Sequence, residues 1–145
     1  MLFRSEAVRI GGGINHRFGL YDMIMLKDNH IDYCGSIENA IESAYNYVTK
    51  NNLNLKIEVE TRNLIDVEKV ISVGKVDRIM LDNFQPDEII KALKLINGKY
   101  ETEASGGINL NNIEAYAKTG VDFVSCGAII HQAKSIDLSL KASFL

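Results

Sequence analysis

Short apolar runs alternate along the chain with longer segments whose apolar residues recur at helical spacing. Taken in order, the apolar runs predict strands at Glu6–Ile10, Met23–Leu26, Leu55–Val59, Arg78–Leu81, Tyr100–Ala104 and Phe123–Cys126. Strands that alternate with helices in this way are typical of a parallel sheet or barrel. The pattern therefore predicts an α/β fold of about six βα units.

Residues with helix-capping preferences mark where the intervening helices begin and end. The predicted N-caps or first helical residues are Ser36, Asn63, Pro86, and Asn109 or Asn111. Gly74 and Asn97-Gly98 are typical helix stops, because glycine and asparagine adopt the left-handed backbone that ends a helix. The last apolar segment, Ile136–Leu140, is expected to pack on the sheet or the helices.

Composition narrows the class of protein. A chain of 145 residues is about one domain long. The formal net charge of -3, with Lys and Arg scattered, offers no basic field for nucleic acid. No apolar run approaches the ~20 residues that span a bilayer, MLFRSEAVR has no secretory leader, and Cys34 and Cys126 form no C-x-x-C pair. We expect a soluble cytoplasmic protein with reduced thiols that binds neither nucleic acid nor membrane.

Polar or glycine-rich residues follow every predicted strand. In parallel α/β folds the functional site lies at the carboxyl ends of the strands, where the βα loops gather. The residues at these ends are Gly11–Gly13 with His16-Arg17, Lys27–His30, Glu58 or Glu60, Asp82, Ser105–Gly107 and Gly127. The loops that follow helices resemble ordinary solvent-facing turns. The sequence therefore predicts a site at one end of the sheet.

Two groups of these residues suit a phosphorylated substrate. Ser105–Gly107 and Gly127 precede expected helix starts, where small residues let backbone amides approach an anion. Glu58 and Asp82, on neighbouring strands, could hold Mg²⁺ against a polyphosphate. Each residue also has a structural alternative, since the glycines can form a tight turn and the carboxylates can be solvated or cap a helix.

Three cationic or polar groups suit a substrate that carries carboxylates. Arg17 can bind a carboxylate through two parallel hydrogen bonds, and Lys27 and His16 add compact donors. The structural alternatives are a surface arginine, a capping histidine and a lysine whose stem lies along apolar surface. Zinc is not expected, because His16, His30 and His131 lack zinc-ligand spacing. Neither a G-x-S-x-G elbow nor a G-x-x-x-x-G-K-[ST] loop occurs.

The same motifs carry a family resemblance that spans nearly the whole chain. In order and spacing they resemble the carboxyl-terminal part of the quinolinate phosphoribosyltransferases, also called carboxylating nicotinate-nucleotide pyrophosphorylases. The matching segments are GGGINHRFGLYDMIMLKDNHI, IEVET, IMLDNF, EASGGI and TGVDFVSCGAIIH. The resemblance implies an incomplete TIM-like α/β barrel. It also implies Mg²⁺-dependent synthesis of nicotinate mononucleotide, pyrophosphate and CO₂ from quinolinate and phosphoribosyl pyrophosphate, in NAD biosynthesis.

The resemblance assigns a role to each candidate residue. It implies that His16, Arg17 and Lys27 line the quinolinate pocket. It makes Lys27, Glu58 and Asp82 catalytic, with the two carboxylates beside the ribose and the metal-bound pyrophosphate. The residues implied around the phosphate end are Ser105, Gly106, Gly107, Gly127 and His131. By spacing to IMLDNF the closer match is Glu58, although Glu60, two residues on, would share its face.

The chain differs from the family at its amino-terminal end. Family members have an amino-terminal α/β domain and an Arg-Lys-Thr-x-Pro-type motif ahead of the triple glycine, whereas MLFRSEAVRI precedes Gly11 here. In the family an arginine from the partner subunit also completes each site. We therefore expect residues 1–145 to form a truncated barrel domain that is homo-oligomeric and has little or no turnover alone. The alternatives are a non-catalytic phosphate-binding or interaction domain and a molybdenum-associated paralogue of the family.

Overall fold

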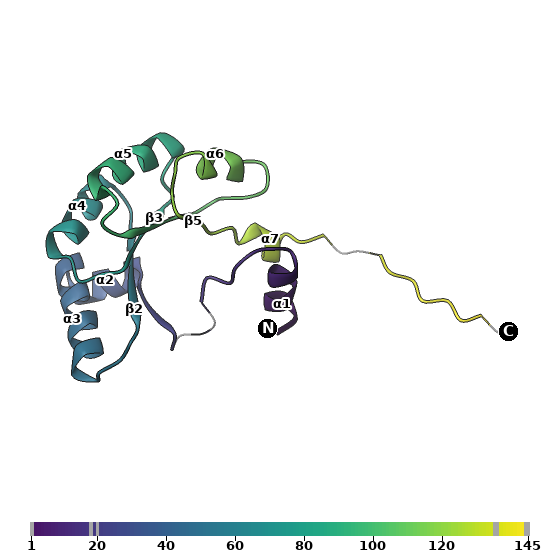
Figure 1. Cartoon of the computed structure of the whole chain (residues 1–145), viewed down its shortest axis with the longest axis horizontal. Coiled ribbons are helices and arrows are strands. Elements are labelled where there is room, and N and C mark those ends of the chain that lie inside the picture. Colours follow the sequence, from purple (N-terminus) through teal and green to yellow (C-terminus); the bar gives the residue numbers. More distant parts are fainter. Residues whose placement is uncertain (1, 18, 20, 135–136, 144–145) are drawn as a thin grey trace.

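The centre of the molecule is a five-stranded parallel sheet with the strand order β1-β2-β3-β4-β5. The computed structural model describes residues 2–17, 19, 21–134 and 137–143 (Figure 1). The strands are β1 (Met23–Leu26), β2 (Lys56–Thr61), β3 (Arg78–Asp82), β4 (Glu101–Ser105) and β5 (Phe123–Val124). Each strand pairs with the one before it, as in a barrel wall; in a doubly wound sheet the order would reverse at a switch point. The α/β prediction is confirmed.

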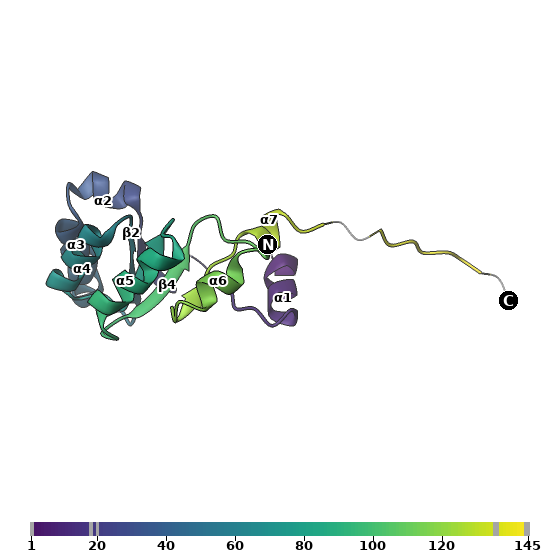
Figure 2. The same cartoon turned by 90° about the horizontal axis from the view of Figure 1, so that it is seen from above.

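The structure describes seven helices, some of which cover one face of this sheet. They are α1 (Leu2–Ile10), α2 (Asp28–Cys34), α3 (Ile37–Lys50), α4 (Leu64–Val73), α5 (Pro86–Ile96), α6 (Ile113–Ala117) and α7 (Ala128–His131). Helices α3, α4 and α5 lie side by side along the outer face, as Figures 1 and 2 both show. Helices α1 and α7 lie away from this layer.

The hydrophobic core lies between the sheet and these outer helices. Alternate strand residues, among them Ile57, Val59, Ile79 and Leu81, are almost fully buried in one cluster with apolar residues of α3, α4 and α5. Successive side chains of a strand point to opposite faces. The intervening residues, Glu58, Glu60, Arg78, Met80, Glu101 and Glu103, therefore face the inner side. The sheet has an apolar outer face and a largely polar inner face.

The predicted caps of the long helices are confirmed. Ser36 accepts a hydrogen bond from the backbone N–H of Asn39 at 3.1 Å, and Asn63 accepts one from Asp66 at 3.0 Å. Pro86 occupies the first turn of α5. Two later elements are shorter than predicted, because α6 begins only at Ile113 and β5 ends at Val124.

The prediction of a strand at Glu6–Ile10 is wrong, because these residues form the end of helix α1. Glu6 and Arg9 pair across one helical turn at 2.5 Å, an interaction that a strand would not allow. The helix is followed by Gly12, whose positive φ of 84° breaks the helical path. Among the described residues the sheet therefore has five strands, one fewer than predicted.

Helix α2 was not predicted, because its residues Lys27–His30 were interpreted only as site residues. Lys27 is the N-cap, and the Nδ1 atom of His30 accepts its backbone N–H at 3.0 Å. Gly35 ends the helix in the left-handed conformation, with φ 81°. The KDNH segment thus combines a helix start with a rim of polar side chains.

The end of the chain does not pack as predicted. Leu138 is 86% exposed and Leu140 is fully exposed, and residues 137–143 run away from the sheet in both views. Ile136 lies outside the described residues. Two further findings concern the whole described chain: Cys34 and Cys126 form no disulfide, and none of the helices described is both long and apolar enough to cross a membrane.

The core makes a direct prediction about stability. Ile79 lies in the central strand with 0% of its surface exposed, so Ile79→Ala should lower the free energy of unfolding by about 2–5 kcal/mol. Ile65 on α4 is 64% exposed, and Ile65→Ala should change it by no more than about 0.5 kcal/mol. Urea unfolding of both variants measures the difference, and equal losses would contradict this placement of the core.

Candidate active site

The carboxyl ends of the strands surround a cleft of about 640 Å³. Its lining residues are His16, Arg17, Met25, Lys27, Asp28, Asn29, Glu60, Met80, Asp82, Ser105 and Ser125. Strands β1 to β4 each supply a lining residue, and Ser125 directly follows β5. Clefts of this size at this end of a parallel sheet commonly bind small ligands.

The three predicted cationic or polar residues meet in this cleft. His16 and Arg17 come from the loop after α1, and Lys27 comes from the junction of β1 and α2. Arg17 donates a hydrogen bond to the backbone oxygen of Met23 at 3.4 Å, which ties the loop to the first strand. Residues from two separate segments therefore form one positively charged side of the cleft.

The cleft contains Glu60 and Asp82, whereas Glu58 is not part of its lining. Both glutamates are on the inner face of β2, because residues two apart point the same way. Glu60 lies nearer the carboxyl end and is partly exposed, whereas Glu58 lies one layer deeper with a side chain that is 0% exposed. The alternative that spacing left open, Glu60, is thus the glutamate that shares the cleft with Asp82.

Glu60 and Asp82 form an acidic side of the cleft. Burial, together with the negative charges of Asp82 and Asp28, raises the pKa of Glu60 above its ordinary value. Asn83 donates a side-chain hydrogen bond to Asp82 at 2.5 Å and so helps to fix its carboxylate. Carboxylates that repel one another in this way are stabilised by a cation, so the pair is chemically suited to a divalent ion.

The turn after β4 brings backbone rather than side chains to the cleft rim. Gly106 and Gly107 have positive φ angles of 92° and 64°, which favour glycine. The backbone N–H of Asn83 donates to the oxygen of Ser105 at 2.8 Å, so the turns after β3 and β4 touch. Ser105 lines the cleft, and Gly106 and Gly107 follow it in the chain without being among the lining residues.

Gly127 and His131 stand at the start and the end of the four-residue helix α7 and are not among the residues that line the cleft. A Cβ on Gly127 would lie 3.4 Å from the ring of His131, so these two predicted residues are near each other. Of the predicted phosphate-end residues, the structure brings Ser105 into the cleft.

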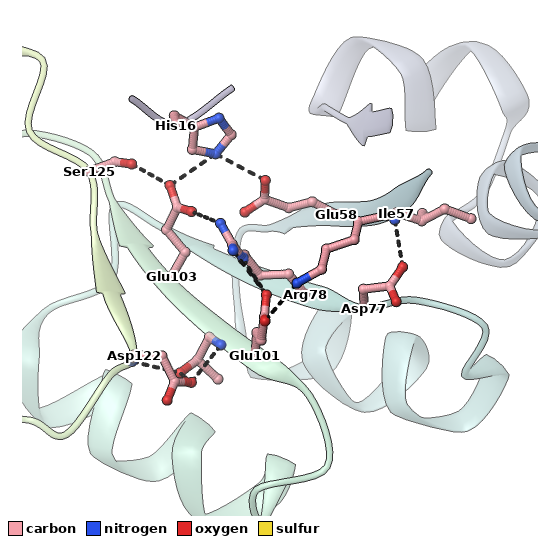
Figure 3. Close-up of polar contacts among 11 residues, drawn as sticks. His16, Ile57, Glu58, Asp77, Arg78, Glu101, Glu103, Asp122 and Ser125 are labelled. Carbon is pink, nitrogen blue, oxygen red and sulfur yellow. Dashed lines mark hydrogen bonds and ion pairs between the residues drawn. The ribbon is translucent and has the colours of Figure 1, made fainter. Parts of the chain in front are cut away.

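A buried polar network lies beneath His16 (Figure 3). The Nε2 atom of His16 lies 3.0 Å from Glu58 and 3.1 Å from Glu103, whose side chains are 0% and 1% exposed. Arg78 binds Glu103 and Glu101 at 2.9 Å each, and Ser125 donates a short hydrogen bond to Glu103. The guanidinium of Arg78 also stacks 4.0 Å from the ring centre of Phe123.

The network shifts the pKa values of its members. The close contacts of its Nε2 atom with the carboxylates of Glu103 and Glu58 raise the pKa of His16 to about 9. Burial raises the pKa of Glu58. Burial acts in the same direction on Glu103, but hydrogen bonds from His16 and Ser125 outweigh it and hold the pKa of that carboxyl below its usual value. His16 is therefore an imidazolium at neutral pH.

Sequence reasoning missed Glu103, Arg78 and Ser125. A signal for Glu103 was present, since Glu101 and Glu103 alternate with apolar or small residues in β4 as Glu58 and Glu60 do in β2. Arg78 and Ser125 gave no such signal, because a strand arginine and a loop serine are ordinary surface residues by pattern alone.

Comparison with known proteins agrees with this geometry. A family model described as quinolinate phosphoribosyl transferase, C-terminal domain, matches residues 1–141. The chain is 46% identical over 149 positions to a chloroplastic, carboxylating nicotinate-nucleotide pyrophosphorylase of Arabidopsis thaliana, with 93% of this chain and 43% of that protein covered. A probable enzyme of the same name from Bacillus subtilis (strain 168) is 46% identical over 139 residues, covering 96% and 47%.

A solved structure extends this likeness to three dimensions. The nicotinate-nucleotide pyrophosphorylase from Francisella tularensis superposes with a TM-score of 0.82 at 46% identity, over 92% of this chain and 46% of that one. The chain spans less than half the length of the two curated relatives described above.

The pKa of His16 predicts a pH dependence of stability. Because the folded-state pKa of about 9 lies above the ordinary value of 6.5, the stabilisation is complete below pH 6.5 and is lost as pH rises through 9. The free energy of unfolding should fall over that window by on the order of 1–3 kcal/mol. His16→Gln should remove this slope in denaturant titrations at several pH values; an unchanged slope would contradict the raised pKa.

The contact between the turns after β3 and β4 gives a second prediction. A Cβ at Gly106 would lie 2.6 Å from both the backbone nitrogen and the Cγ of Asn83. Gly120 has a similar φ of 88° but open space around it. Gly120→Ala should therefore cost only the backbone strain of about 1–2 kcal/mol, and Gly106→Ala at least about 1 kcal/mol more. Equal losses in thermal or urea unfolding would contradict the close approach.

Proposed function

Because the chain belongs to the quinolinate phosphoribosyl transferase C-terminal domain family, we propose that its cleft serves the transfer of a phosphoribosyl group to quinolinate. The donor is phosphoribosyl pyrophosphate, and the products are nicotinate mononucleotide, pyrophosphate and CO₂, in NAD biosynthesis. The observation that carries this proposal is that one cleft is lined both by cationic groups, His16, Arg17 and Lys27, and by the carboxylates of Asp28, Glu60 and Asp82. These two sets are called the cationic and the acidic side of the cleft below.

The cationic side suits the pyridine substrate. Quinolinate carries two carboxylates next to each other on its ring, so its site needs several fixed positive charges. Arg17 offers a planar donor pair, Lys27 a compact ammonium and His16 an imidazolium. Because the ring nitrogen is next to the carbon that bears one of these carboxylates, binding both carboxylates would also fix the position of the nitrogen.

The acidic side and the turn after β4 suit the phosphorylated sugar. When the bond from ribose C1 to pyrophosphate breaks, positive charge develops on the ribose, and carboxylates nearby stabilise it. Glu60 and Asp82, on neighbouring strands, are the carboxylates of the cleft to which we assign this role, with Asp82 held by Asn83. Ser105 and the backbone of Gly106 and Gly107 would receive phosphate oxygens at the rim.

The pair of carboxylates that would hold Mg²⁺ is also Glu60 and Asp82. Burial, and after it the negative charge of Asp82, raises the pKa of Glu60, and a divalent cation would offset both effects. When bound, such an ion neutralises charge that accumulates on the pyrophosphate. Glu58, the glutamate first expected here, is engaged with His16 and has no place in this proposal.

The second half of the reaction asks less of the protein. After the ring nitrogen has bonded to ribose C1, the adjacent carboxylate departs as CO₂ and leaves its electron pair on the ring carbon, where the positive charge of the ring nitrogen stabilises it until a proton bonds to that carbon. The protein has to hold the other carboxylate in place during this step. Lys27 and Arg17 are in position to do so, because both line the cationic side.

We also propose that the complete reaction involves more polypeptide than residues 1–145. The chain spans less than half the length of its curated relatives, and the cleft is bounded by five strands. An oligomer of identical chains would be one source of further groups. The isolated 145-residue chain is therefore expected to bind ligands with little or no turnover, and robust formation of nicotinate mononucleotide by it would contradict this.

Ligand titration tests the proposed function. Isothermal titration of the chain with quinolinate, and separately with phosphoribosyl pyrophosphate and Mg²⁺, should show binding of both. Lys27→Ala should weaken quinolinate binding at least about tenfold, a loss of about 1.4 kcal/mol in binding free energy, because it removes one charge of the cationic side. Lys118→Ala, which alters an exposed lysine paired with Glu114 on α6, is the matched control and should bind normally.

The outcome also separates the proposal from its alternative. Binding of phosphoribosyl pyrophosphate without any binding of quinolinate would overturn the proposed transferase site and favour a phosphate-binding domain. Asp82→Asn should show the opposite pattern to Lys27→Ala. Its affinity for phosphoribosyl pyrophosphate should fall and its affinity for quinolinate should be retained, since Asp82 lies on the acidic side.

A further inference from the structure

The histidine of the cationic side has no regular secondary structure to hold it. His16 lies in the loop between α1 and β1, and its side chain is 26% exposed. Its Nε2 atom points into the protein, towards Glu58 on β2 and Glu103 on β4. In Figure 3 the second ring nitrogen lies on the side of the ring away from both carboxylates. Among the residues described, the ion pairs of the ring are made through Nε2.

Glu103 is itself firmly oriented. Arg78 donates to one of its oxygens at 2.9 Å, and Ser125 donates to the other, which also faces His16. Arg78 is fixed in turn by Glu101 and by stacking on Phe123. These groups come from three adjacent strands and the residue after β5, so the position of the Glu103 carboxylate is set by the sheet.

Glu58 stands in a different relation to its surroundings. Within the described chain neither of its oxygens receives a hydrogen bond of good geometry, although both are buried. A buried carboxylate without hydrogen bonds is costly unless an opposite charge lies close by. His16, at 3.0 Å, is the cation in direct ion-pair contact with it among the described residues. The main stabilising partner of the Glu58 carboxylate is therefore His16.

We propose that Glu58 and Glu103 are positioning residues for His16, which hold its ring by Nε2 and leave Nδ1 as a fixed cationic donor towards the cleft. This inference rests on the proposed function for the identity of the ligand, a pyridine dicarboxylate. The orientation of the His16 ring is inferred independently of the proposed function. Arg78 and Ser125 act one step further back, by orienting Glu103.

The charges around His16 explain why two buried carboxylates are needed. Arg78 lies behind Glu103, Arg17 follows His16 in the chain, and Lys27 lines the same cleft. An imidazolium among these cations would be repelled and would lose its proton or move away. Glu103 is shared with Arg78, so the second carboxylate, Glu58, supplies the remaining negative charge. The cationic side of the cleft can therefore carry three positive groups at once.

The ring orientation can be tested without any ligand. In ¹H–¹⁵N spectra of the labelled chain, the Nε2–H proton of His16 should appear as a downfield, slowly exchanging signal, identified by its loss in His16→Gln. Glu58→Gln and Glu103→Gln should each move this signal upfield and speed its exchange, because a neutral amide is a weaker acceptor than a carboxylate. Glu101→Gln is the matched control: it alters the other carboxylate partner of Arg78 without touching His16, and the signal should persist with a smaller change than in the Glu58 and Glu103 variants.

A binding measurement then connects the orientation to the ligand. Glu58→Gln and Glu103→Gln should weaken quinolinate binding by about tenfold or more and leave the affinity for phosphoribosyl pyrophosphate unchanged. A general loss of structure would weaken the binding of both ligands. Circular dichroism and thermal melting confirm that each variant is folded.

Three results would overturn the proposal: no slowly exchanging Nε2–H signal in the parent chain, an equal effect of Glu101→Gln, or stoichiometric Zn²⁺ binding that both glutamine variants abolish. The last would indicate a metal triad, since the three ligand atoms lie within 4.8 Å of one another. If the parent chain shows the signal but never binds quinolinate, the proposed function fails and the positioning of His16 stands.

Discussion

Charge buried on the inner face of the sheet is the constraint on which the candidate site depends. Glu58, Arg78 and Glu103 are carried by three adjacent strands, and the period of two along each strand sends them all to the same side. Their helix-facing neighbours are apolar and build the core. A buried ion network is costly unless its members pair, and here His16 and Ser125 complete the pairing from outside the strands.

This inner network also organises the cleft above it. The next residues towards the strand ends on the same face are Glu60 and Ser105, with Asp82 beside Ser105 in register. The deeper layer holds one cationic group, His16, in place, and the upper layer presents the acidic pair to solvent. The sheet face therefore supplies the acidic pair, whereas the cationic groups come from the loop after α1 and the junction of β1 and α2.

The loops after the strands provide the remaining geometry. The turn at Gly106 lies so close to Asn83 that no side chain fits between them, and Asn83 itself adopts a left-handed conformation with φ 59°. Such conformations are costly for residues other than glycine and persist where the surroundings enforce them. Here they bring Asp82 and Ser105 to the same rim, joined by the hydrogen bond from Asn83 to Ser105.

The sequence by itself determined the βα alternation, the caps at Ser36 and Asn63 and the placement of polar groups after strands, because these follow from local periodicity and backbone preference. It could not decide between strand and helix for the short segment Glu6–Ile10, whose few apolar residues fit both periods. Nor could it distinguish Glu58 from Glu60. Their shared face follows from the chain, but their depth follows from register and from where β2 ends. The contacts of His16 with Glu58 and Glu103 join residues far apart in sequence. Only the tertiary structure could decide them, because the pairing of strands brings those side chains together.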